Sequence, residues 1–563
     1  MNYMDSYNEW LNSDIIDEET KEQLRLLPKE EIEDNFYKDL EFGTSGLRGL
    51  MGPGTNRMNK YTIAKISEGL ANHVLKKPFT EPSIVIAYDS RKNSKLFATI
   101  VALIFNKKGI KSYIFKELTP TPVLAYALLY LKCSVAVNIT SSHNAKEYNG
   151  YKIYNNKGFQ VVNPDDIDIT NEINKITEYQ NIDINEVDEM YSKGLFNYVD
   201  DELLRSFAID TRDIVCSINN NKDIKIVYTP LHGTGTKMMT EVLNGAGFIE
   251  VYNVLEQRYP DSNFRTTPYP NPEDTSTFEI AKAVAIKKDA DIIIATDPDA
   301  DRMGVMIRDK AGEYNYLSGN QVGVLLADYI IKTTMHLPNR LIIRSIVTTT
   351  MIDKMAKENN ISLEEVYTGT KYIGERMQYY DENNEKNYIF GFEESIGYLI
   401  GKYVRDKNSF TAALAICELC AYLKTKDVYM ADYLRHLYEI YGFYSEETVS
   451  DTYTGIEGVA KIKSIMEKFR NTNIDNIIGL KIVTKEDFLT QKKYDYNTNE
   501  ESCIELSPSN VLRYTLEDGS WFAVRPSGTE PKIKYYLQAV DNNKTNSKEK
   551  IEKLKAYLTE NFR

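Results

Sequence analysis

The chain of 563 residues has few cysteines, no long apolar run and no excess of basic residues. No apolar segment reaches the roughly 18 residues that a membrane-spanning helix needs, so we expect no membrane span. The formal net charge of −14, with no basic stripe to offset it, argues against nucleic acid as a partner. Residues 1–10 are polar and acidic, unlike a secretory signal. We therefore expect a cytoplasmic protein.

Five cysteines, an odd and sparse set, are typical of a chain kept in a reducing compartment. Two of them, Cys417 and Cys420, form a C-x-x-C pair inside Ser409–Leu423, whose Ala- and Leu-rich pattern predicts a helix. No second pair of Cys or His accompanies them. We therefore expect buried helix thiols rather than a zinc or redox site.

Common signatures of hydrolases and nucleotide-dependent enzymes are also missing. The chain has neither the G-x-S-x-G elbow, the G-x-x-x-x-G-K-[ST] phosphate loop nor the protein-kinase motif set. Nucleotide-driven phosphoryl transfer is therefore unsupported. Any transferred phosphoryl group would come from the substrate or from the protein itself.

Three aspartates alternate in the loop 297–302 (DPDADR), directly after the apolar run Ile292–Ala295. Carboxylates at i, i+2 and i+4 of an extended loop can direct hard oxygen ligands toward one point, and Mg²⁺ prefers such ligands. An EF-hand shares this beginning, but its sixth and twelfth positions require Gly and Glu, where this chain has Arg302 and Arg308. The loop predicts a magnesium site, with a solvated acidic turn as the alternative. Arg302 is a cation suited to a phosphate oxygen beside the metal.

A serine-containing turn, Thr140–Asn144, follows a second apolar strand pattern, Ser134–Ile139. Ser and Asn are common in turns because their side chains bond local backbone, so a purely structural turn is the alternative. A serine that carries a phosphoryl group, together with an all-oxygen metal site, predicts metal-assisted phosphoryl transfer.

Further apolar strand patterns run into polar or Gly-rich loops at 88–91, 229–235, 393–395 and 525–532. Open α/β sheets bind ligands outside the carboxyl ends of their strands, so these loops are expected to converge on a cleft. Arg525–Lys532 is typical of a phosphate cradle, with a plain Pro-Gly turn as the alternative. Phe42–Gly49 has the same character, whereas Glu393 and Ser395 suit sugar hydroxyls.

Alternating strand and helix patterns predict an α/β protein whose mixed or parallel sheets are covered by helices. The length is sufficient for three or four domains. The acidic, Asn-rich stretch Asn163–Glu189 is predicted to separate the first α/β domain from the next. The predicted parts are a helical lead-in at 1–40 and domains at 41–205, 206–320, 321–445 and 446–563.

In combination these motifs resemble the α-D-phosphohexomutases, and within them the phosphoglucomutase/phosphomannomutase family. The resemblance extends over about residues 40–535, with the motifs in the family's order. The family's T-[AGS]-S-H-N phosphoserine loop is matched by Thr140–Asn144, and its D-x-D-x-D-R metal loop by Asp297–Arg302. The other matches are G-T-[SA]-G-x-R-G from Gly43, T-G-x-K from Thr368, G-x-E-x-S from Gly391 and R-x-S-G-T-E-P from Arg525.

The resemblance implies three related α/β domains and a C-terminal α+β domain around a central cleft. It implies one Mg²⁺ per chain, held by Asp297, Asp299, Asp301 and the phosphate on Ser142. The residues for which it implies substrate binding are Arg302, Thr368, Gly369, Lys371, Glu393, Ser395, Lys407, Arg525, Ser527, Gly528 and Thr529. Arg48 and Lys152 resemble candidates for proton transfer and charge stabilisation, and His143 is either a base or a loop-fixing residue.

The implied reaction interconverts α-D-glucose 1-phosphate and glucose 6-phosphate. Phosphorylated Ser142 gives its phosphoryl group to the 6-hydroxyl, and glucose 1,6-bisphosphate, the expected intermediate and activator, turns over before its 1-phosphate returns to Ser142. A mobile C-terminal domain would keep water from the intermediate. The expected partners are small sugar phosphates, and we expect a monomer or a small homo-oligomer.

Some positions depart from the family's pattern. Ser141 stands where Ala or Gly usually precedes the reactive serine. Gly397 and Tyr398 occupy the region in which members that accept both mannose and glucose often have His, and Lys407 resembles a lysine of glucose-type members. These residues favour glucose. Phosphopentomutase and phosphomannomutase activities are the alternatives on the same scaffold, and a plain phosphatase or a non-catalytic sugar-phosphate sensor are alternatives of other classes.

Overall fold

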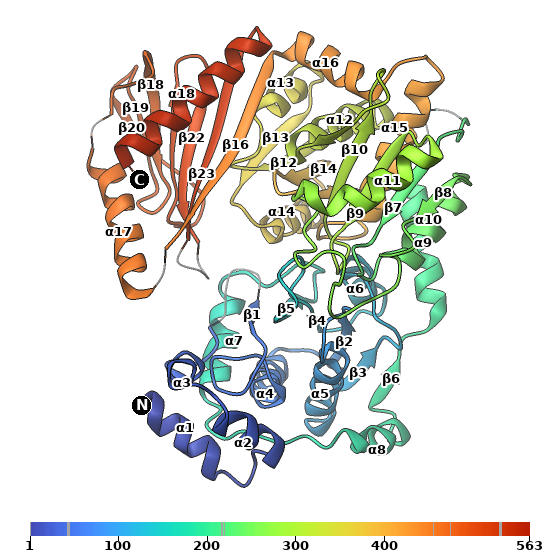
Figure 1. Ribbon diagram of the computed structural model, residues 1–563, viewed down its shortest axis with the longest axis vertical. Helices are drawn as coiled ribbons and strands as arrows, with labels where there is room; N and C mark the ends of the chain where they lie inside the picture. Colours follow the sequence, from blue (N-terminus) through green and yellow to red (C-terminus); the bar gives the residue numbers. More distant parts are fainter. Residues whose placement is uncertain are drawn as a thin grey trace. The chain divides into compact units, whose positions relative to one another are not determined.

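The computed structural model describes residues 2–41, 46–215, 218, 220–453, 455–472, 474–527 and 532–562. The chain divides into two compact units, one of residues 1–341 and 369–429 and the other of residues 342–368 and 430–563. Both units combine sheets with helices (Figure 1), which confirms the predicted α/β class. None of the helices within the described ranges is long and apolar enough to cross a bilayer.

Three short helices begin the first unit: α1 (Tyr3–Asn12), α2 (Glu18–Arg25) and α3 (Lys29–Phe36). The side chains of Asn2 and Asp17 accept hydrogen bonds at the N-termini of α1 and α2, which stabilises helices this short. Trp10 is buried and packs edge to face on Phe36 and on Tyr61 of the following helix, at ring distances of 5.6 and 5.5 Å. The helical lead-in is therefore packed against the first α/β layer.

The first sheet has the strand order β1-β5-β4-β2-β3-β6. Neighbours among β2, β3, β4 and β6 pair in parallel, whereas β5 is antiparallel to both β1 and β4. The strands are β1 (Leu47–Leu50), β2 (Ser83–Tyr88), β3 (Lys111–Ile114), β4 (Val135–Ile139), β5 (Tyr148–Asn155) and β6 (Phe196–Tyr198). The helices are α4 (Lys60–Lys76), α5 (Ser94–Lys107), α6 (Thr121–Tyr130), α7 (Asp165–Asn174) and α8 (Val187–Ser192), with a 3₁₀ turn at Ile184–Glu186.

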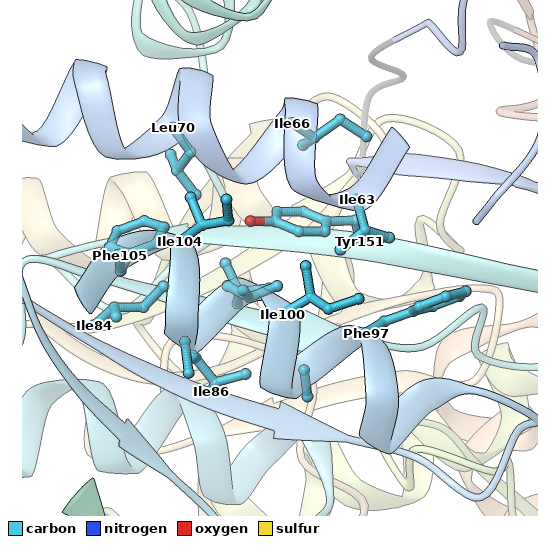
Figure 2. Close-up of a cluster of buried hydrophobic side chains, with 14 of the residues drawn as sticks. Ile63, Ile66, Leu70, Ile84, Ile86, Phe97, Ile100, Ile104, Phe105 and Tyr151 are labelled. Atoms are coloured by element: carbon cyan, nitrogen blue, oxygen red, sulfur yellow. The ribbon is translucent and has the colours of Figure 1, made fainter. Parts of the chain in front are cut away.

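A hydrophobic core lies between this sheet and helices α4 and α5 (Figure 2). Ile63 and Leu70 of α4 and Ile100 of α5 are fully or almost fully buried, as is Tyr151 of β5. The Tyr151 hydroxyl lies 3.1 Å from the hydroxyl of Ser67 within the core. Burial of each such apolar side chain contributes about 1.5–3 kcal/mol, so this core fixes the sheet from which the serine turn projects.

The stretch Asn163–Glu189 does not separate two domains, so that prediction was wrong. It forms α7, which packs on α4 so closely that a Cβ at Gly69 would lie 2.6 Å from Cα of Ile173. Glu172 of α7 pairs with Lys76 of α4 at 2.6 Å. The acidic composition suggested a solvated linker. Lysines from a distant segment neutralise the carboxylates, however, and this allows the stretch to pack against α4.

The second sheet has the order β11-β10-β9-β7-β8, in which β7 is parallel to β8 and β9, and β10 is antiparallel to β9 and β11. Its strands are β7 (Ile226–Thr229), β8 (Val251–Asn253), β9 (Ile292–Thr296), β10 (Met303–Arg308) and β11 (Tyr314–Leu317). Its helices are α9 (Asp201–Ile214), α10 (Thr236–Gly245) and α11 (Glu279–Lys288), preceded by a 3₁₀ turn at Thr275–Phe278. The aspartate loop connects β9 to β10, so it leaves the sheet at the carboxyl end of a fully buried strand.

The first unit is completed by α12 (Gly319–Thr333), α14 (Thr370–Asn383), β14 (Asn387–Glu393), β15 (Gly397–Ile400) and α15 (Ser409–Lys424). Strands β14 and β15 form an antiparallel hairpin. Helix α15 contains the C-x-x-C pair; Cys417 is buried, and burial raises the pKa of the Cys420 thiol to about 12. Both cysteines are free thiols on a packed helix; Cys417 is buried, as predicted, whereas Cys420 is only partly buried.

The second unit contains most of β12 (Arg340–Ser345), then α13 (Met351–Glu358), β13 (Ser362–Val366) and α16 (Met430–Tyr441). Its large sheet has the order β16-β23-β22-β21-β18-β19-β20, and β17 pairs with β18. The strands are β16 (Phe443–Thr452), β17 (Asn476–Ile477), β18 (Leu480–Asp487), β19 (Lys492–Asp495), β20 (Glu500–Cys503), β21 (Leu512–Leu516), β22 (Trp521–Pro526) and β23 (Lys532–Asp541). Helices α17 (Gly455–Asn471) and α18 (Lys544–Phe562) pack on it, and Phe469 stacks on Phe562 at 3.8 Å.

Candidate active site

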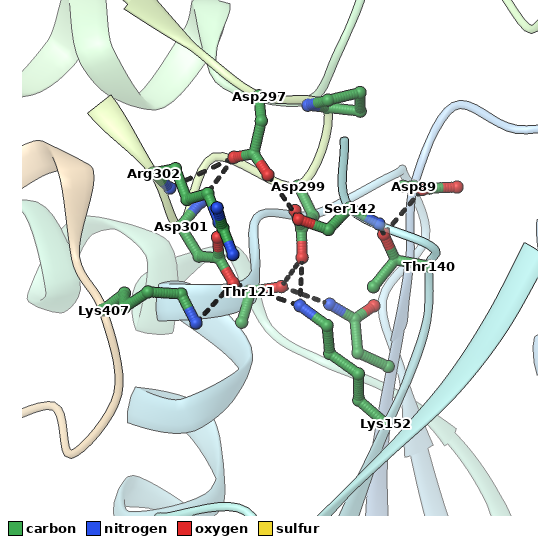
Figure 3. A network of polar contacts seen from close by, with 12 residues as sticks. Asp89, Thr121, Thr140, Ser142, Lys152, Asp297, Asp299, Asp301, Arg302 and Lys407 are labelled. Atoms are coloured by element: carbon green, nitrogen blue, oxygen red, sulfur yellow. Dashed lines mark hydrogen bonds and ion pairs between the residues drawn. The ribbon is translucent and has the colours of Figure 1, made fainter. Parts of the chain in front are cut away.

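Ser142 lies in the turn that follows β4 and is almost completely buried. Its hydroxyl donates to Oδ2 of Asp297 at 2.5 Å (Figure 3). Nδ1 of His143 lies 3.3 Å from the same Oγ. The backbone of Ser142 is in the left-handed region, with φ of 53°. The turn thus aims the hydroxyl of Ser142 at the aspartate loop of the second sheet.

Asp297, Asp299 and Asp301 are buried and each offers a carboxylate oxygen within 4.8 Å of the others. Within the described ranges they are the one such group of His, Cys, Asp or Glu side chains. The Oδ1 atoms of Asp299 and Asp301 are buried without a hydrogen-bond partner in the described chain. Orphaned buried oxygens are costly unless a ligand satisfies them, and three carboxylates suit a hard dication. The residues therefore fit a divalent metal ion.

The backbone of the metal loop is held by three elements. The carbonyl oxygens of residues 298–300 each accept a hydrogen bond from a different donor residue. Thr234 donates both its N–H and its hydroxyl to the carbonyl oxygen of residue 298. Thr121 donates its N–H to the carbonyl oxygen of residue 299, and Ser409 donates its hydroxyl to that of residue 300. These distances are 2.7–2.9 Å. These bonds fix a loop in which Ala300 has a φ of 52°. The loop is preorganised by contacts from segments far apart in sequence.

Two buried lysines face the carboxylates (Figure 3). Nζ of Lys152 lies 2.6 Å from Oδ2 of Asp299 and 3.1 Å from Oδ2 of Asp301, and Nζ of Lys407 lies 3.2 Å from Oδ2 of Asp301. Burial alone would raise the pKa of Asp301, but Lys152 and Lys407 lower that pKa below its usual range. Burial and the neighbouring carboxylates raise the pKa of Asp297 well above its usual range. The two lysines therefore neutralise Asp299 and Asp301, whereas neither lysine pairs with Asp297 in the described chain.

Two arginines provide positive charge beside the serine turn. Arg48 projects from β1, and its Nε is buried without a hydrogen-bond partner in the described ranges. The backbone N–H of Arg302 donates to Asp297 at 3.1 Å. Burial, with Arg302 nearby, lowers the pKa of Arg48, and burial together with both arginines lowers the pKa of His143 well below its usual range. The imidazole of His143 is therefore neutral, and this corner of the site favours an anion.

Glu393 and Ser395, which are expected to bind sugar hydroxyls, lie on the β14–β15 hairpin, and Gly369 and Lys371 lie at the start of α14. Oε1 of Glu393 accepts a hydrogen bond from the N–H of Gly369 at 2.5 Å. Nζ of Lys371 lies 3.5 Å from the carbonyl oxygen of Val161, and Ser395 is partly exposed. The structure thus brings Glu393, Gly369 and Lys371 together around one helix N-terminus.

Gly397 makes room for the lysine that reaches the metal loop. A Cβ at this position would lie 2.4 Å from Cδ of Lys407. The stem of Lys407 therefore crosses the backbone of the hairpin at a residue without a side chain, and its Nζ reaches Asp301. Lys407 can occupy this position only because Gly397 has no side chain.

The predicted phosphate loop belongs to the second unit. Arg525 lies on β22 opposite Lys534 of β23, and the N–H of Ser527 donates to the carbonyl oxygen of Lys532 at 2.7 Å. Thr368, directly after β13, is also part of this unit. Gly528 and Thr529 of the phosphate loop, and Gly43–Ser45 of the N-terminal motif, lie outside the described residues.

Several positioning residues were not predicted from the sequence. Thr121 at the start of α6 donates its hydroxyl to Oδ2 of Asp299 at 2.6 Å, and Asn138 donates to that hydroxyl at 2.6 Å. Asp89 and Arg91 follow β2 and bond to the serine turn. The loop at 88–91 was recognisable as a polar stretch after a strand, but nothing local in the sequence connects it to Ser142.

Comparison with known sequences identifies the family. Models of the phosphoglucomutase/phosphomannomutase α/β/α domains I, II and III match residues 39–180, 207–312 and 318–441, and the model of the C-terminal domain matches residues 459–554. The chain belongs to the phosphoglucomutase/phosphomannomutase family. This confirms the resemblance that was based on the motifs.

Curated relatives agree over most of the chain. The phosphoglucomutase of Staphylococcus epidermidis (strain ATCC 12228) is 37% identical over 531 residues, which cover 94% of this chain and 96% of the relative. The phosphoglucomutase of Staphylococcus haemolyticus is 37% identical over 514 residues, with 91% and 92% coverage. Membership of the phosphoglucomutase/phosphomannomutase family is thus supported over more than 90% of the chain.

Solved structures support the fold of the family. The phosphoglucomutase parafusin of Paramecium, in an open form, superposes with a TM-score of 0.67 at 19% identity, covering 93% of this chain and 95% of that chain. A phosphomannomutase-like protein of Thermus thermophilus gives a TM-score of 0.67 at 17% identity, with 93% and 99% coverage. At these identities the similarity shows the shared architecture.

Proposed function

We propose that the chain is a phosphoglucomutase that interconverts α-D-glucose 1-phosphate and glucose 6-phosphate through phosphorylated Ser142. The observation that carries the proposal is the hydroxyl of Ser142, buried and 2.5 Å from Asp297 of the three-carboxylate loop. A serine that stores a phosphoryl group next to a dication needs this arrangement. The curated relatives with the name phosphoglucomutase support the choice of reaction.

The first half-reaction transfers the phosphoryl group from Ser142 to the 6-hydroxyl of the sugar. The new O6–P bond forms as the bond from phosphorus to Oγ breaks; the 6-hydroxyl loses its proton and Oγ gains one, so no net proton is consumed. Phosphoryl transfer needs mainly positioning and charge neutralisation. Lys152, paired with Asp299, supplies positive charge from the protein, and the charge of Arg302 acts on His143 beside Ser142.

Proton transfer at Ser142 is assigned to His143. Burial alone would lower the pKa of Lys152, but Asp299 and Asp301 outweigh burial, so the pKa of Lys152 is raised above its ordinary value. Lys152 therefore stays a cation and stabilises charge. His143 is neutral, and its Nδ1, 3.3 Å from Oγ of Ser142, is in position to accept the serine proton when the 1-phosphate returns. Reversal of the same step returns the proton.

We propose Mg²⁺ as the resident metal and glucose 1,6-bisphosphate as intermediate and activator. Asp297, Asp299 and Asp301 would hold the ion, with an oxygen of the phosphate on Ser142 as a further ligand. When bound, Mg²⁺ supplies a positive charge that neutralises the transferring phosphoryl group. The Oδ1 atoms of Asp299 and Asp301, which have no hydrogen-bond partner among the described residues, support this assignment.

Sugar and phosphate recognition is assigned to the remaining motif residues. Glu393 and Ser395 would bind sugar hydroxyls, with Gly369, Lys371 and Lys407 beside them. In the second unit, Arg525, Ser527 and Thr529 with Gly528 would bind the phosphate that is not transferred, and Thr368 would also contact substrate. Glucose is proposed as the sugar because Lys407 resembles the lysine of glucose-type members, and Gly397 leaves room for its stem.

The test is ³¹P NMR of glucose 1-phosphate with Mg²⁺, a trace of glucose 1,6-bisphosphate and the enzyme. We expect glucose 6-phosphate, and a phosphoryl adduct on Ser142 by intact mass that glucose 1-phosphate removes. Ser142→Ala should abolish both. Ser141→Ala is the matched control: its buried hydroxyl has no partner in the described chain, so the variant should keep the adduct and the activity.

The alternatives predict other outcomes. Persistence of interconversion in Ser142→Ala would refute the proposal. Release of inorganic phosphate without an isomeric sugar phosphate would indicate a phosphatase, and binding without turnover a sensor. If ribose 1-phosphate or mannose 1-phosphate exceeded glucose 1-phosphate by more than about tenfold in kcat/KM, the sugar assignment would be wrong.

A further inference from the structure

The motif at 88–91, which the proposed reaction leaves without a role, forms a cradle under the serine turn. Arg91 is buried just beyond β2, and its Nη2 donates to the carbonyl oxygens of Ser142 and Asn144 at 2.6 and 2.5 Å. Its Nη1 donates to the carbonyl oxygens of Ala145 and Tyr148 at 2.7 and 3.0 Å. A single guanidinium therefore spans the whole turn that carries the nucleophile.

Asp89 connects the other side of the turn to the same arginine. Its Oδ2 accepts hydrogen bonds from Nε of Arg91 at 3.1 Å and from the hydroxyl of Thr140 at 2.7 Å. The same Thr140 hydroxyl oxygen accepts the N–H of Ser142 at 2.9 Å (Figure 3). Both backbone polar groups of Ser142 are thus held, directly or through Thr140, by the Asp89–Arg91 pair.

This support is needed because Ser142 has a left-handed backbone. A non-glycine residue at positive φ costs about 1–2 kcal/mol and persists where surrounding contacts determine it. Ser142 has a φ of 53°, and in this conformation its hydroxyl reaches Asp297. Relaxation of the turn would move Oγ away from the metal loop.

The hydrogen-bond geometry excludes contact between Arg91 and a substrate phosphate. A guanidinium has five N–H donors and no acceptor. All of the Arg91 donors are used by Asp89 and the four carbonyl oxygens of the turn. The Phe264 ring lies over the guanidinium, 5.2 Å from its central carbon. No donor remains for a phosphate oxygen.

We propose that Arg91 positions the nucleophile Ser142. Arg91 acts through the backbone of Ser142 and does not touch the substrate. The inference deepens the proposed function and depends on it. Lysine cannot replace Arg91, because an ammonium has three donors at one point and cannot span four carbonyl oxygens. Displacement of a reacting atom by about 1 Å can cost about 100-fold in rate, so kcat should depend on this arginine.

The experiment compares Arg91→Lys with Arg57→Lys. Arg57 is a matched control in the same unit, a buried arginine that bonds the carbonyl oxygens of Asp34 and Asn56. For Arg91→Lys we expect a fall of about 100-fold in kcat and a KM for glucose 1-phosphate within about threefold of wild type. Phosphorylation of Ser142 by glucose 1,6-bisphosphate, followed by intact mass, should slow similarly. For Arg57→Lys both constants should stay within about threefold.

A second pair of variants tests the same support of Ser142 in case Arg91→Lys does not fold. Thr140→Val removes the hydroxyl that joins Asp89 to the N–H of Ser142 and keeps the side-chain shape, whereas Thr140→Ser restores it. We expect kcat to fall by about tenfold or more in the first and to recover in the second. Melting temperatures establish that all variants fold.

The outcomes separate the two proposals. Suppose that wild-type Ser142 carries the phosphoryl adduct, but kcat of both Arg91→Lys and Thr140→Val stays near the wild-type value. This result would overturn the positioning role of Arg91 and leave the proposed function intact. A rise of about tenfold in KM at unchanged kcat would overturn it too, because it would place Arg91 on the substrate. The absence of any phosphoryl adduct on wild-type Ser142 would overturn the proposed function and this inference together.

Discussion

Thr121 donates its hydroxyl hydrogen to Oδ2 of Asp299 across 2.6 Å, although 178 positions separate the two residues in the chain. The same hydroxyl accepts a hydrogen bond from Asn138 at 2.6 Å, and the N–H of Thr121 donates to the Asp299 carbonyl oxygen at 2.8 Å. A residue of the first sheet's layer therefore orients the carboxylate of Asp299. Its other oxygen, Oδ1, has no hydrogen-bond partner in the part of the chain that the structure describes and can bind a ligand.

The first prediction concerns Thr121. Thr121→Val keeps the shape but removes the hydroxyl, so Asp299 loses its orienting donor. We expect Mn²⁺ binding, measured by electron paramagnetic resonance, to weaken about 10–100-fold, which is typical for loss of a partner of a metal ligand. Thr121→Ser keeps the hydroxyl and should bind Mn²⁺ within a few-fold of wild type. Equal affinities in Val and Ser variants would show that Thr121 does not orient Asp299.

The second prediction concerns the metal itself. Because three buried carboxylates gather in the loop, a bound dication should stabilise the folded chain. Mg²⁺ at about 100 times its Kd should add about 2.7 kcal/mol, seen as a higher Tm, and chelation should reverse the shift and stop turnover. Asp301→Asn should lose most of the shift. Sodium chloride of matched ionic strength is the control; an equal rise of Tm in that salt would indicate screening instead of site binding.

The third prediction concerns Glu446 on β16. Burial raises the pKa of Glu446 to about 7, although the hydroxyl of Thr349 opposes the shift. The pKa of Glu446 in the folded chain therefore exceeds its unfolded value of 4.5. Between about pH 4.5 and pH 7, the folded chain holds a proton on Glu446 that the unfolded chain has lost. This contribution to stability is complete below about pH 4.5 and is lost as the pH rises through about 7.

The contribution of Glu446 to stability is at most about 3.5 kcal/mol, at about 1.4 kcal/mol per pKa unit. We expect Glu446→Gln to flatten the fall in Tm between pH 5 and pH 8, measured by calorimetry. Glu500→Gln, which changes an exposed carboxyl of β20, is the control and should leave the pH profile as it is. A profile of Glu446→Gln that parallels wild type would contradict the assignment.

The fourth prediction concerns a buried network of ion pairs in the second unit. Arg513 contacts Glu486 at 2.6 Å and Glu365 at 2.8 Å, and Arg344 contacts Glu365 at 2.7 Å. Burial alone would raise the pKa of Glu365, but the two arginines hold that pKa far below its usual range. The network therefore depends on all of its charges.

Arg513→Met should leave Glu486 and Glu365 without their shared partner, because it removes one charge and keeps a long apolar side chain. Loss of one partner from a buried ion pair typically costs about 3–5 kcal/mol, measured as the free energy of unfolding in urea. Lys193→Met, which breaks an exposed pair with Glu189, should cost about 1 kcal/mol or less. Similar losses in the two variants would show that burial adds nothing to the network.

Much of the candidate site was predictable because its chemistry is local in sequence. The spacing of Asp297, Asp299 and Asp301 on one loop predicted a shared metal site, and the structure places their oxygens within 4.8 Å of each other. Apolar strand patterns predicted which loops leave the carboxyl ends of strands, as for the turn after β4. Residue type and spacing thus indicated the reaction before any packing was known.

Other parts of the site could not be predicted from local patterns. The stretch Asn163–Glu189 has the composition of a linker, yet its Glu172 is neutralised by Lys76 of a distant helix. Lys407 reaches Asp301 because Gly397 leaves room for its stem. These outcomes depend on which segments pack together, and no window of the sequence contains that information.

The sequence by itself determined the reacting groups, namely the serine hydroxyl, the three carboxylates and the cations in their loops, because these identities are read directly at each position. Only the tertiary structure decided that Arg91 and Thr121 hold two of those groups in place. The physical reason is that hydrogen bonds between side chains and distant backbone atoms arise from strand register and helix packing, which bring together residues that are far apart along the chain.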